Sequence, residues 1–450
     1  MKTYDLIVIG SGPGGYVSAI RAAQLGKSTA IVEKAKVGGA CLNVGCVPSK
    51  VLLKHGAMVQ EIKKAGSFGI DTGEINIDYA RLTERKTDVV QKLTDGVGYL
   101  LDKNSVALYE GSADVKDSHT VAVNGENIKA DNILLATGSR PFIPPIKGLE
   151  SSAYETTDTF FELTELPKEL VVIGGGVIGS EIASAAAMLG SSVTIIEAAA
   201  DILLTEEEEV SAALKDHLES QGVHIVTQAD IKEVQDGKVL STDDTFSYDT
   251  LLVATGRTPN TEAAANLNLK TGPDDKSIEV DDYYETSEQN IYAIGDLIGR
   301  YQLAHAASAE GIAAVDAMTG KGRPKLNQTD IPRCIYTALE AASIGLSEAE
   351  AEQAGFNVSV SRSPFSSNSK AAVDGDEGGF IKIINDKQHG ELLGAFIVGK
   401  NATELIGEVL ATQASEGTMH ELSDVVQPHP SQSEAIGESA GLFFNQAIHI

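Results

Sequence analysis

Two stretches of the chain share one pattern of apolar and polar positions. Residues 6–9 form an unbroken apolar run with branched side chains, a glycine-rich turn follows, and a small-residue helical pattern then extends to residue 26. A second apolar run at 30–32 ends in Glu33. Unbroken apolar runs are typical of strands buried on both faces of a parallel sheet. The pattern therefore predicts a strand, a turn, a helix and a second strand in an α/β unit.

The same order recurs between residues 170 and 197, where the second apolar run ends in Glu197. In a GxGxxG turn the first glycine permits a tight bend, the second admits a pyrophosphate, and the third lets helix and strand pack closely. Free N–H groups at the helix start bind the pyrophosphate. Two such turns, each followed by an acid at the same spacing, predict two dinucleotide sites rather than glycine turns without a ligand. The candidate glycines are Gly10, Gly12, Gly14 and Gly15 in the first site and Gly174, Gly176 and Gly179 in the second.

The two acids, Glu33 and Glu197, are expected to accept hydrogen bonds from the ribose of an adenosine. Glu197 favours a free 2′-hydroxyl, since a carboxylate that faces a 2′-phosphate costs on the order of a few kcal/mol. Residues 198–201 are alanines and an aspartate, so no arginine stands ready for a phosphate. The second site is therefore predicted to prefer NAD to NADP.

A further repeated pattern links the two halves of the chain. Residues 134–141 and 252–259 each consist of an apolar strand that ends in a glycine turn near a proline. Each lies where a nucleotide-binding unit should close. Thr137 and Gly138 are therefore candidates for the first site, and Gly256 for the second.

The chain has three cysteines, too few for a framework of structural disulfides. Cys41 and Cys46 lie close together and can form a small-ring disulfide that is easily reduced if helical geometry strains it. Lys50, one turn beyond Cys46, would favour the thiolate. A zinc site is disfavoured because no second Cys/His pair stands at ligand spacing. The pair is predicted to be redox-active.

With the two glycine units, the segment 38–50 resembles the two-cysteine flavoprotein disulfide reductases, over essentially the whole chain. The resemblance implies that the first unit binds FAD and the second NAD. Within the family, the chain looks like the members that reoxidise lipoyl groups in 2-oxoacid dehydrogenase complexes. It thus implies oxidation of dihydrolipoamide, a lipoyl-bearing acyltransferase as partner, and a homodimer.

The implied architecture is α/β, with two Rossmann-like dinucleotide-binding domains and a C-terminal α+β dimerisation domain. We expect the FAD-binding domain at 1–146, the NAD-binding domain at 147–266, a second part of the FAD-binding (central) domain at 267–325, and the dimerisation domain at 326–450.

Further site residues follow from the resemblance alone. The stretch 286–296 looks like the family's second FAD motif, in which Asp296 meets the ribityl chain of the flavin. Lys50 would lie near the flavin and pair with Glu181, which is otherwise an exposed helix acid. The residues that would line the flavin are Leu303, Ala304 and His305.

The C-terminal third contains no glycine phosphate motif. Residues 380–384 and 392–398 are predicted strands joined by a hairpin turn, and 404–414 is a predicted helix. A polar, serine-rich stretch at 361–370 is predicted to be a loop.

Near the end, His429 stands between two prolines that stiffen the backbone, and Glu434 follows at a distance that allows it to orient the imidazole. A histidine between prolines is often a surface turn residue. Its resemblance to the family's His–Glu dyad, together with the cysteine pair, favours a role as the proton acceptor.

Some features depart from the family or have no assigned role. Leu339 stands where the family usually has a proline, which puts the local loop shape in doubt. Cys334 is expected to be a small buried hydrophobic residue. The acidic run 206–209 opens a predicted helix, whose dipole tolerates it, and no function is assigned to it.

The net charge of −29 disfavours binding to nucleic acid, because such a surface repels phosphates. No apolar run approaches the roughly 20 residues of a membrane helix, and the run at 6–9 is too short for a signal peptide. A cytoplasmic location is expected. Two alternatives stay open: another FAD-dependent disulfide reductase of the same family, and a non-catalytic flavin redox sensor.

Overall fold

The first repeated pattern forms one end of a mostly parallel sheet. In the computed structural model, which describes residues 1–322 and 325–450, β1 (Thr3–Ile9) pairs in parallel with β2 (Thr29–Glu33) and with β6 (Glu126–Leu135). The helix α1 (Pro13–Gln24) connects β1 to β2. The sheet is completed by β3 (Ala107–Glu110), β4 (Ala113–Asp117), β5 (Thr120–Val123) and, much later in the chain, β16 (Ile291–Ala293). The predicted strands are confirmed, and the chain returns to the first sheet after the second unit.

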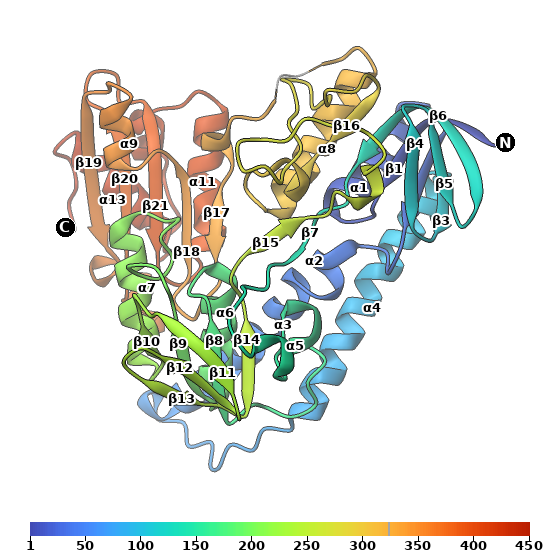
Figure 1. Cartoon of the computed structure of the whole chain (residues 1–450). Coiled ribbons are helices and arrows are strands. Elements are labelled where there is room, and N and C mark those ends of the chain that lie inside the picture. The colour runs from blue at the N-terminus through green and yellow to red at the C-terminus, as the bar shows by residue number, and fades with distance from the viewer. Residues whose placement is uncertain (323–324) are drawn as a thin grey trace.

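The second repeated pattern forms a separate, fully parallel sheet (Figure 1). Its strands are β10 (His224–Val226), β9 (Ser192–Ile196), β8 (Glu169–Ile173) and β14 (Thr250–Val253), in that order. Its helices are α6 (Val177–Leu189) and α7 (Glu208–Ser220). A small antiparallel sheet of β11 (Ile231–Gln235), β12 (Lys238–Ser241) and β13 (Thr245–Ser247) is attached to it.

A two-stranded ribbon joins the two nucleotide units. It pairs β7 (Ser139–Pro141) with β15 (Arg257–Pro259) in antiparallel fashion, and Figure 1 shows it between the two sheets. These strands directly follow the two echoed glycine turns. The repeated segments 134–141 and 252–259 therefore complete the two units and also connect them.

The cysteine segment lies on two consecutive helices. Cys41 is in the short helix α2 (Gly39–Asn43), and Cys46 opens α3 (Cys46–Lys64). The long helix α4 (Tyr79–Lys103) follows, and the short α5 (Thr157–Phe160) precedes the second sheet. In Figure 1, α2 and α3 lie centrally, between the two nucleotide units.

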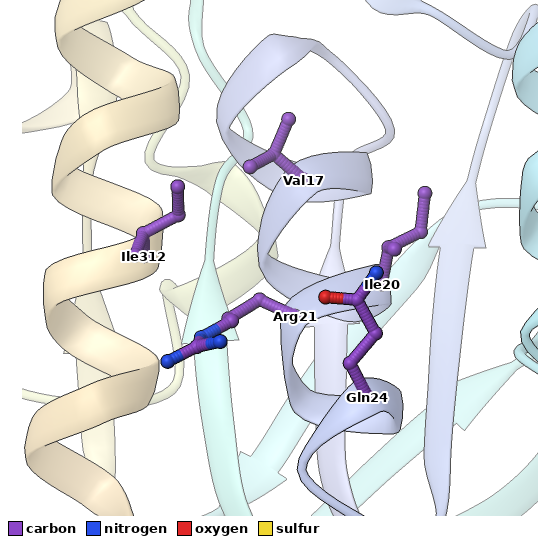
Figure 2. A pocket seen from close by; sticks show the side chains of 5 residues that line it. All are labelled: Val17, Ile20, Arg21, Gln24 and Ile312. Carbon is purple, nitrogen blue, oxygen red and sulfur yellow. The ribbon is translucent and has the colours of Figure 1, made fainter. Parts of the chain in front are cut away.

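The helix α8 (Ala304–Met318) packs closely against α1. A Cβ atom on Gly311 would lie 2.2 Å from the Oγ of Ser18, so only glycine permits this approach. Arg21 of α1 forms an ion pair with Asp316 of α8 at 2.7 Å. Figure 2 shows the outer edge of this contact, a shallow depression beside Ile312. None of the predicted site residues lines it.

The C-terminal unit is one antiparallel sheet with helices packed on it. The strand order is β17 (Arg333–Ile335), β18 (Ala341–Gly345), β21 (Leu392–Val398), β20 (Phe380–Asp386) and β19 (Val358–Pro364). The helices are α9 (Glu348–Gln353), α10 (Ser369–Asp374), α11 (Ala402–Ala414), α12 (Met419–Asp424) and α13 (Glu434–Phe443). The predicted strands at 380–384 and 392–398 and the helix at 404–414 are confirmed.

The loop predicted at 361–370 is wrong. The stretch contains the end of β19, a 3₁₀ turn and the start of α10. Ser361 and Ser363 are buried, and the hydroxyl of Ser363 donates to the carbonyl of Ala435. Serine composition suggested a loop, but residues 358–364 pair with β20, and α13 supplies a buried acceptor for the Ser363 hydroxyl.

The acidic run 206–209 joins the second nucleotide unit to the C-terminal sheet. Glu206 accepts hydrogen bonds from Arg333 at 3.2 Å and from Ser343 at 2.9 Å. The buried ammonium of Lys382 lies 2.7 Å from Glu207 and 2.8 Å from Glu209. The run therefore has a structural role that its sequence did not reveal.

Among the described residues, no helix combines the length and the apolar character needed to cross a membrane.

We expect Lys382→Met to lower the free energy of unfolding by roughly 3–5 kcal/mol, because it leaves the Glu207 carboxylate without its buried cation, although Glu209 keeps its ion pair with Arg362 at 3.0 Å. Chemical denaturation followed by circular dichroism measures this. Lys147→Met is the control: its ion pair with Glu233 at 3.0 Å is largely exposed, so the loss should stay below about 1 kcal/mol. Equal stability of the two variants would contradict the structural role of the acidic run.

Candidate active site

The first glycine of each motif makes a bend that no other residue accommodates. Gly10 has a φ of +98°, and a Cβ there would lie 2.3 Å from the carbonyl oxygen of Ala136. Gly174 has a φ of +110°, and its Cβ would lie 2.4 Å from the carbonyl oxygen of Ala254. The two turns thus have the same backbone conformation, and in each the carbonyl oxygen of an alanine excludes any side chain.

The second and third glycines differ from the first in their surroundings. A Cβ on Gly12 or Gly176 would meet no atom within 4 Å, so both backbones face open space at the start of a helix. A Cβ on Gly15 would lie 1.9 Å from the carbonyl oxygen of Gly10, and one on Gly179 would lie 2.0 Å from that of Gly174. An open second glycine and a tightly packed third one fit a pyrophosphate at each helix N-terminus.

The acid after each motif is tied to its own turn in the same way. Glu33 accepts hydrogen bonds from the backbone N–H groups of Ser11 at 2.9 Å and Ala35 at 2.8 Å. Glu197 accepts them from Gly175 and Ala199, both at 2.7 Å. The Ser11 hydroxyl also donates to the Oε2 of Glu33 at 2.7 Å, so that oxygen is fully occupied. The Oε1 of Glu33 and both oxygens of Glu197 keep a lone pair that can accept from a ribose hydroxyl.

The cysteine segment lies directly against the first glycine turn. The N–H of Gly38 donates to the carbonyl of Ser11 at 3.1 Å, and a Cβ on Gly39 would lie 2.6 Å from the Cα of Gly12. This approach places Cys41, which follows on α2, beside the first glycine turn and its dinucleotide site, here called the first cradle; the second glycine turn and its site are the second cradle. In the structure Cys41 and Cys46 are thiols.

The pKa values of the two thiols are shifted in opposite directions. A hydrogen bond from the Cys41 thiol to Cys46 is the largest cause that lowers the pKa of Cys46, to about 7, and the Lys50 ammonium contributes in the same direction. The same hydrogen bond, together with burial, raises the pKa of Cys41. Cys46 is therefore the sulfur that carries negative charge in the reduced pair.

Lys50 and Glu181 form an ion pair between α3 and α6. The Nζ of Lys50 lies 2.7 Å from the Oε2 of Glu181, whose side chain is buried. The two helices approach closely because α3 has Gly56 where a Cβ would lie 2.9 Å from the Cβ of Met188. The pairing expected from the family resemblance is thus present, and Glu181 is not an exposed helix acid.

Tyr336 belongs to this cluster, although nothing in its sequence context singled it out. Its backbone N–H donates to the Oε1 of Glu181 at 3.0 Å, and the Lys50 Nζ lies 4.4 Å from the centre of its ring. The loop beyond it, where Leu339 replaces the family's proline, is closed by a hydrogen bond from Thr337 to the Leu339 carbonyl at 2.6 Å. Proximity in space, not spacing in sequence, identifies Tyr336.

Cys334, two residues before Tyr336, is half-buried rather than fully buried. Burial raises the pKa of its thiol to about 11. It is therefore a neutral thiol at physiological pH.

The residues expected around the flavin lie at the same edge of the first sheet. Asp296 follows β16, where it accepts a hydrogen bond from Ser139, and it lies close enough to contribute to the raised pKa of Cys41. Thr137 and Asn260 exchange two hydrogen bonds, at 2.6 and 3.0 Å, which fixes the turn at Gly138. Leu303, Ala304 and His305 form the N-terminus of α8.

His429 and Glu434 form a dyad in the C-terminal unit. The Nδ1 of His429 lies 2.9 Å from the Oε1 of Glu434, and the N–H of Ser431 donates to the other carboxylate oxygen at 2.8 Å. These bonds lower the pKa of Glu434. The imidazole is exposed, and within the described part of this chain it contacts neither Cys41 nor Cys46 by a hydrogen bond.

Two family models match the chain. The model described as pyridine nucleotide-disulphide oxidoreductase matches residues 4–311, and that of the family's dimerisation domain matches residues 331–440. The chain belongs to the pyridine nucleotide-disulphide oxidoreductase family. The predicted fold class and the resemblance drawn from the sequence are confirmed by these matches.

Relatives and solved structures of this pyridine nucleotide-disulphide oxidoreductase cover the full chain. It is 38% identical to a dihydrolipoyl dehydrogenase of Bacillus subtilis, over 99% of each chain. It is 40% identical to one of Thermus scotoductus, over 100% of this chain and 99% of the other. The HOCl-induced flavoprotein disulfide reductase RclA of Escherichia coli superposes with a TM-score of 0.87 at 28% identity, covering 98% of this chain and 100% of that one.

Membership in the pyridine nucleotide-disulphide oxidoreductase family confirms that the protein is an oxidoreductase. It also confirms the expected cofactors, a flavin (FAD) and a pyridine nucleotide (NAD). The dimerisation domain supports the expected homodimer.

In the two-electron-reduced holoprotein, we expect the Cys46 thiolate to form as the pH rises through about 7, since the pKa is lowered to that value. Lys50→Met should move the midpoint upward, because the loss of a cation disfavours the thiolate. The charge-transfer absorbance between thiolate and flavin measures both midpoints.

Lys54→Met is the matched control, because Lys54 is an exposed residue one turn further along the same helix. Its midpoint should equal that of the unmodified protein. A charge-transfer band that persists in Cys46→Ser would show that Cys46 is not the charged sulfur.

Proposed function

We propose that this protein oxidises dihydrolipoamide to lipoamide and reduces NAD⁺, the activity that names its relatives from Bacillus subtilis and Thermus scotoductus. The observation that carries the proposal is the Cys41–Cys46 pair. It lies against the first nucleotide cradle, and α3, which Cys46 opens, packs on the helix of the second cradle. A dithiol in that position can pass electrons between a lipoyl group and two dinucleotides.

The first cradle would hold FAD through Gly10, Gly12, Gly14, Gly15 and Glu33, with Asp296, Thr137, Gly138 and the start of α8 around the rest of the molecule. The second would hold NAD through Gly174, Gly176, Gly179, Glu197 and Gly256. When bound, FAD supplies a two-electron carrier between the dithiol and NAD. Lys50 and Glu181 would place a fixed positive charge beside the flavin.

The protein's own groups perform the thiol chemistry. Dihydrolipoamide gives a thiol proton to the Nε2 of His429, because the Nδ1 is held by Glu434. The resulting thiolate attacks the Sγ of Cys41 in the disulfide form, the Cys41–Cys46 bond breaks, and Cys46 leaves as a thiolate. The second lipoyl sulfur then attacks the lipoyl sulfur of the mixed disulfide, and the bond to Cys41 breaks. Cys41 takes up the proton that the second lipoyl thiol loses, so lipoamide leaves with Cys41 as a thiol and Cys46 as a thiolate. The lowered pKa of Cys46 makes it the better leaving group.

The separation of the dyad from the cysteines supports a site shared between two subunits. His429 is exposed on the C-terminal unit, which is the part that matches the dimerisation domain. In Figure 1, α13, whose first residue is Glu434, lies in the C-terminal unit at the left, whereas α2 and α3 lie centrally. The dyad of one subunit would therefore serve the cysteine pair of the other.

The partner that follows from this activity is the lipoyl-bearing acyltransferase of a 2-oxoacid dehydrogenase complex. A cytoplasmic location stays a prediction. Two competing functions remain to be tested against the proposal: another disulfide reductase of the family and a flavin redox sensor that does not turn over.

We expect dihydrolipoamide to reduce NAD⁺ with a kcat/KM more than about tenfold above that for NADP⁺, since Glu197 repels the 2′-phosphate. Absorbance of the reduced nicotinamide measures both rates. Glu197→Ala should narrow the ratio between the two nucleotides. A flavin that dihydrolipoamide reduces without reduction of either nucleotide would favour the non-catalytic redox sensor. A preference for NADP⁺ would contradict the role of Glu197.

We expect His429→Gln to lower kcat/KM for dihydrolipoamide by about 10²–10⁴-fold, the usual effect of removing a general base. Mixed dimers with Cys46→Ser subunits should regain activity. Each mixed dimer contains one complete site, so random assembly should restore about a quarter of full activity. Unmixed preparations of each variant are the controls, and a mixture as inactive as either variant alone would place His429 in the site of its own subunit.

A further inference from the structure

Arg257 reaches across the joint between the two nucleotide units. It is the first residue of β15, next to Gly256, and β15 pairs with β7 of the first unit. Its Nε donates to the Ser139 hydroxyl at 2.7 Å, and its Nη2 donates to the Ser139 carbonyl at 2.8 Å. The planar guanidinium of Arg257 thus forms two hydrogen bonds with Ser139, which fix the rotamer of the Ser139 side chain.

Ser139 passes this constraint on to Asp296. The Ser139 hydroxyl accepts from Arg257 and donates to the Oδ2 of Asp296, and the Arg257 Nε lies 3.8 Å from the same oxygen. Within the described ranges 1–322 and 325–450, the Oδ1 of Asp296 has no protein donor. One carboxylate oxygen is therefore held by the protein, and the other is left to accept from a ligand.

The backbone beneath Asp296 is held separately. The buried carboxylate of Glu310, on α8, accepts the N–H of Gly295 at 2.8 Å. This bond anchors the turn independently of Arg257. Loss of Arg257 should therefore free the Asp296 side chain without unfolding the turn that carries it.

We propose that Arg257 is a positioning residue for FAD: through the Ser139 hydroxyl it fixes the Asp296 carboxylate in the orientation that receives the ribityl chain. This inference rests on the proposed contact between Asp296 and FAD. A residue contributed by the exit strand of the NAD unit then determines how tightly the other unit holds its cofactor. Arg257 acts through Ser139 and does not itself have to touch the flavin.

The test is the rate of FAD release from the holoprotein, followed by the rise in fluorescence of free flavin. We expect Arg257→Met and Ser139→Ala to release FAD at least about tenfold faster than the unmodified protein. Asp296→Asn should have an effect at least as large. Since the three residues act as one unit, combining Arg257→Met with Asp296→Asn should add little to Asp296→Asn alone.

Two matched variants separate positioning from general damage. Ser139→Thr keeps the bridging hydroxyl and should retain FAD. Arg140→Met removes an arginine of the same ribbon whose side chain contacts Glu262 at 2.7 Å and Asn260 at 2.8 Å but bonds neither Ser139 nor Asp296, and it should also retain FAD. Circular dichroism of the bound flavin should change in Arg257→Met and Ser139→Ala but not in these two. If Arg257→Met does not fold, the comparison of Ser139→Ala with Ser139→Thr decides.

Normal FAD release from Arg257→Met and Ser139→Ala, with fast release from Asp296→Asn, would overturn the inference and leave the role of Asp296 standing. Normal FAD release from Asp296→Asn would overturn both the inference on Arg257 and the proposed contact between Asp296 and FAD. Fully additive effects of Arg257→Met and Asp296→Asn would also overturn the inference, because the two residues would then act independently.

Discussion

The ion pair between Lys50 and Glu181 is the contact on which the arrangement of the site depends. It joins α3, which Cys46 opens, to α6, which begins at the second glycine cradle. The same carboxylate accepts the backbone N–H of Tyr336, so the C-terminal unit meets both nucleotide units at one point. A buried carboxylate is stable only with such partners. Any relative movement of the three units would leave this charge without some of them.

The nucleotide cradles could be predicted because their chemistry is local. Each is decided by a few consecutive residues: Gly10 and Gly174 are required by positive φ angles, and Gly12 and Gly176 leave open space in which a pyrophosphate can approach the backbone. The cysteine pair was also local. The loop predicted at 361–370 failed for the opposite reason, because the fate of its serines depends on strand β20 and helix α13, which the stretch itself does not reveal.

Arg257 and the acidic run show what sequence patterns could not supply. Arg257 and Ser139 are 118 positions apart, and only the pairing of β7 with β15 brings them together. The run 206–209 was interpreted as the start of a helix, which it is, but its cations come from β17, β19 and β20. In a chain with a net charge of −29, an acidic run gives no signal of its own, so its partners become visible only in the fold.

The proposed mechanism divides electron transfer and proton transfer between different units, and this division would make the domain interfaces part of the chemistry. The Cys46 thiolate is stabilised by groups on α2 and α3, whereas the imidazole that we propose as the proton acceptor lies on the C-terminal unit. If the dyad serves the cysteines of a second subunit, its position is set through every interface between the two. The ion pairs of Glu206 with Arg333 and of Lys382 with the acidic run fix the angle of the C-terminal unit. A small error in that angle would be enlarged at His429, and proton transfer requires hydrogen-bond distance. Rigid packing between the units is therefore a condition for catalysis as well as for stability.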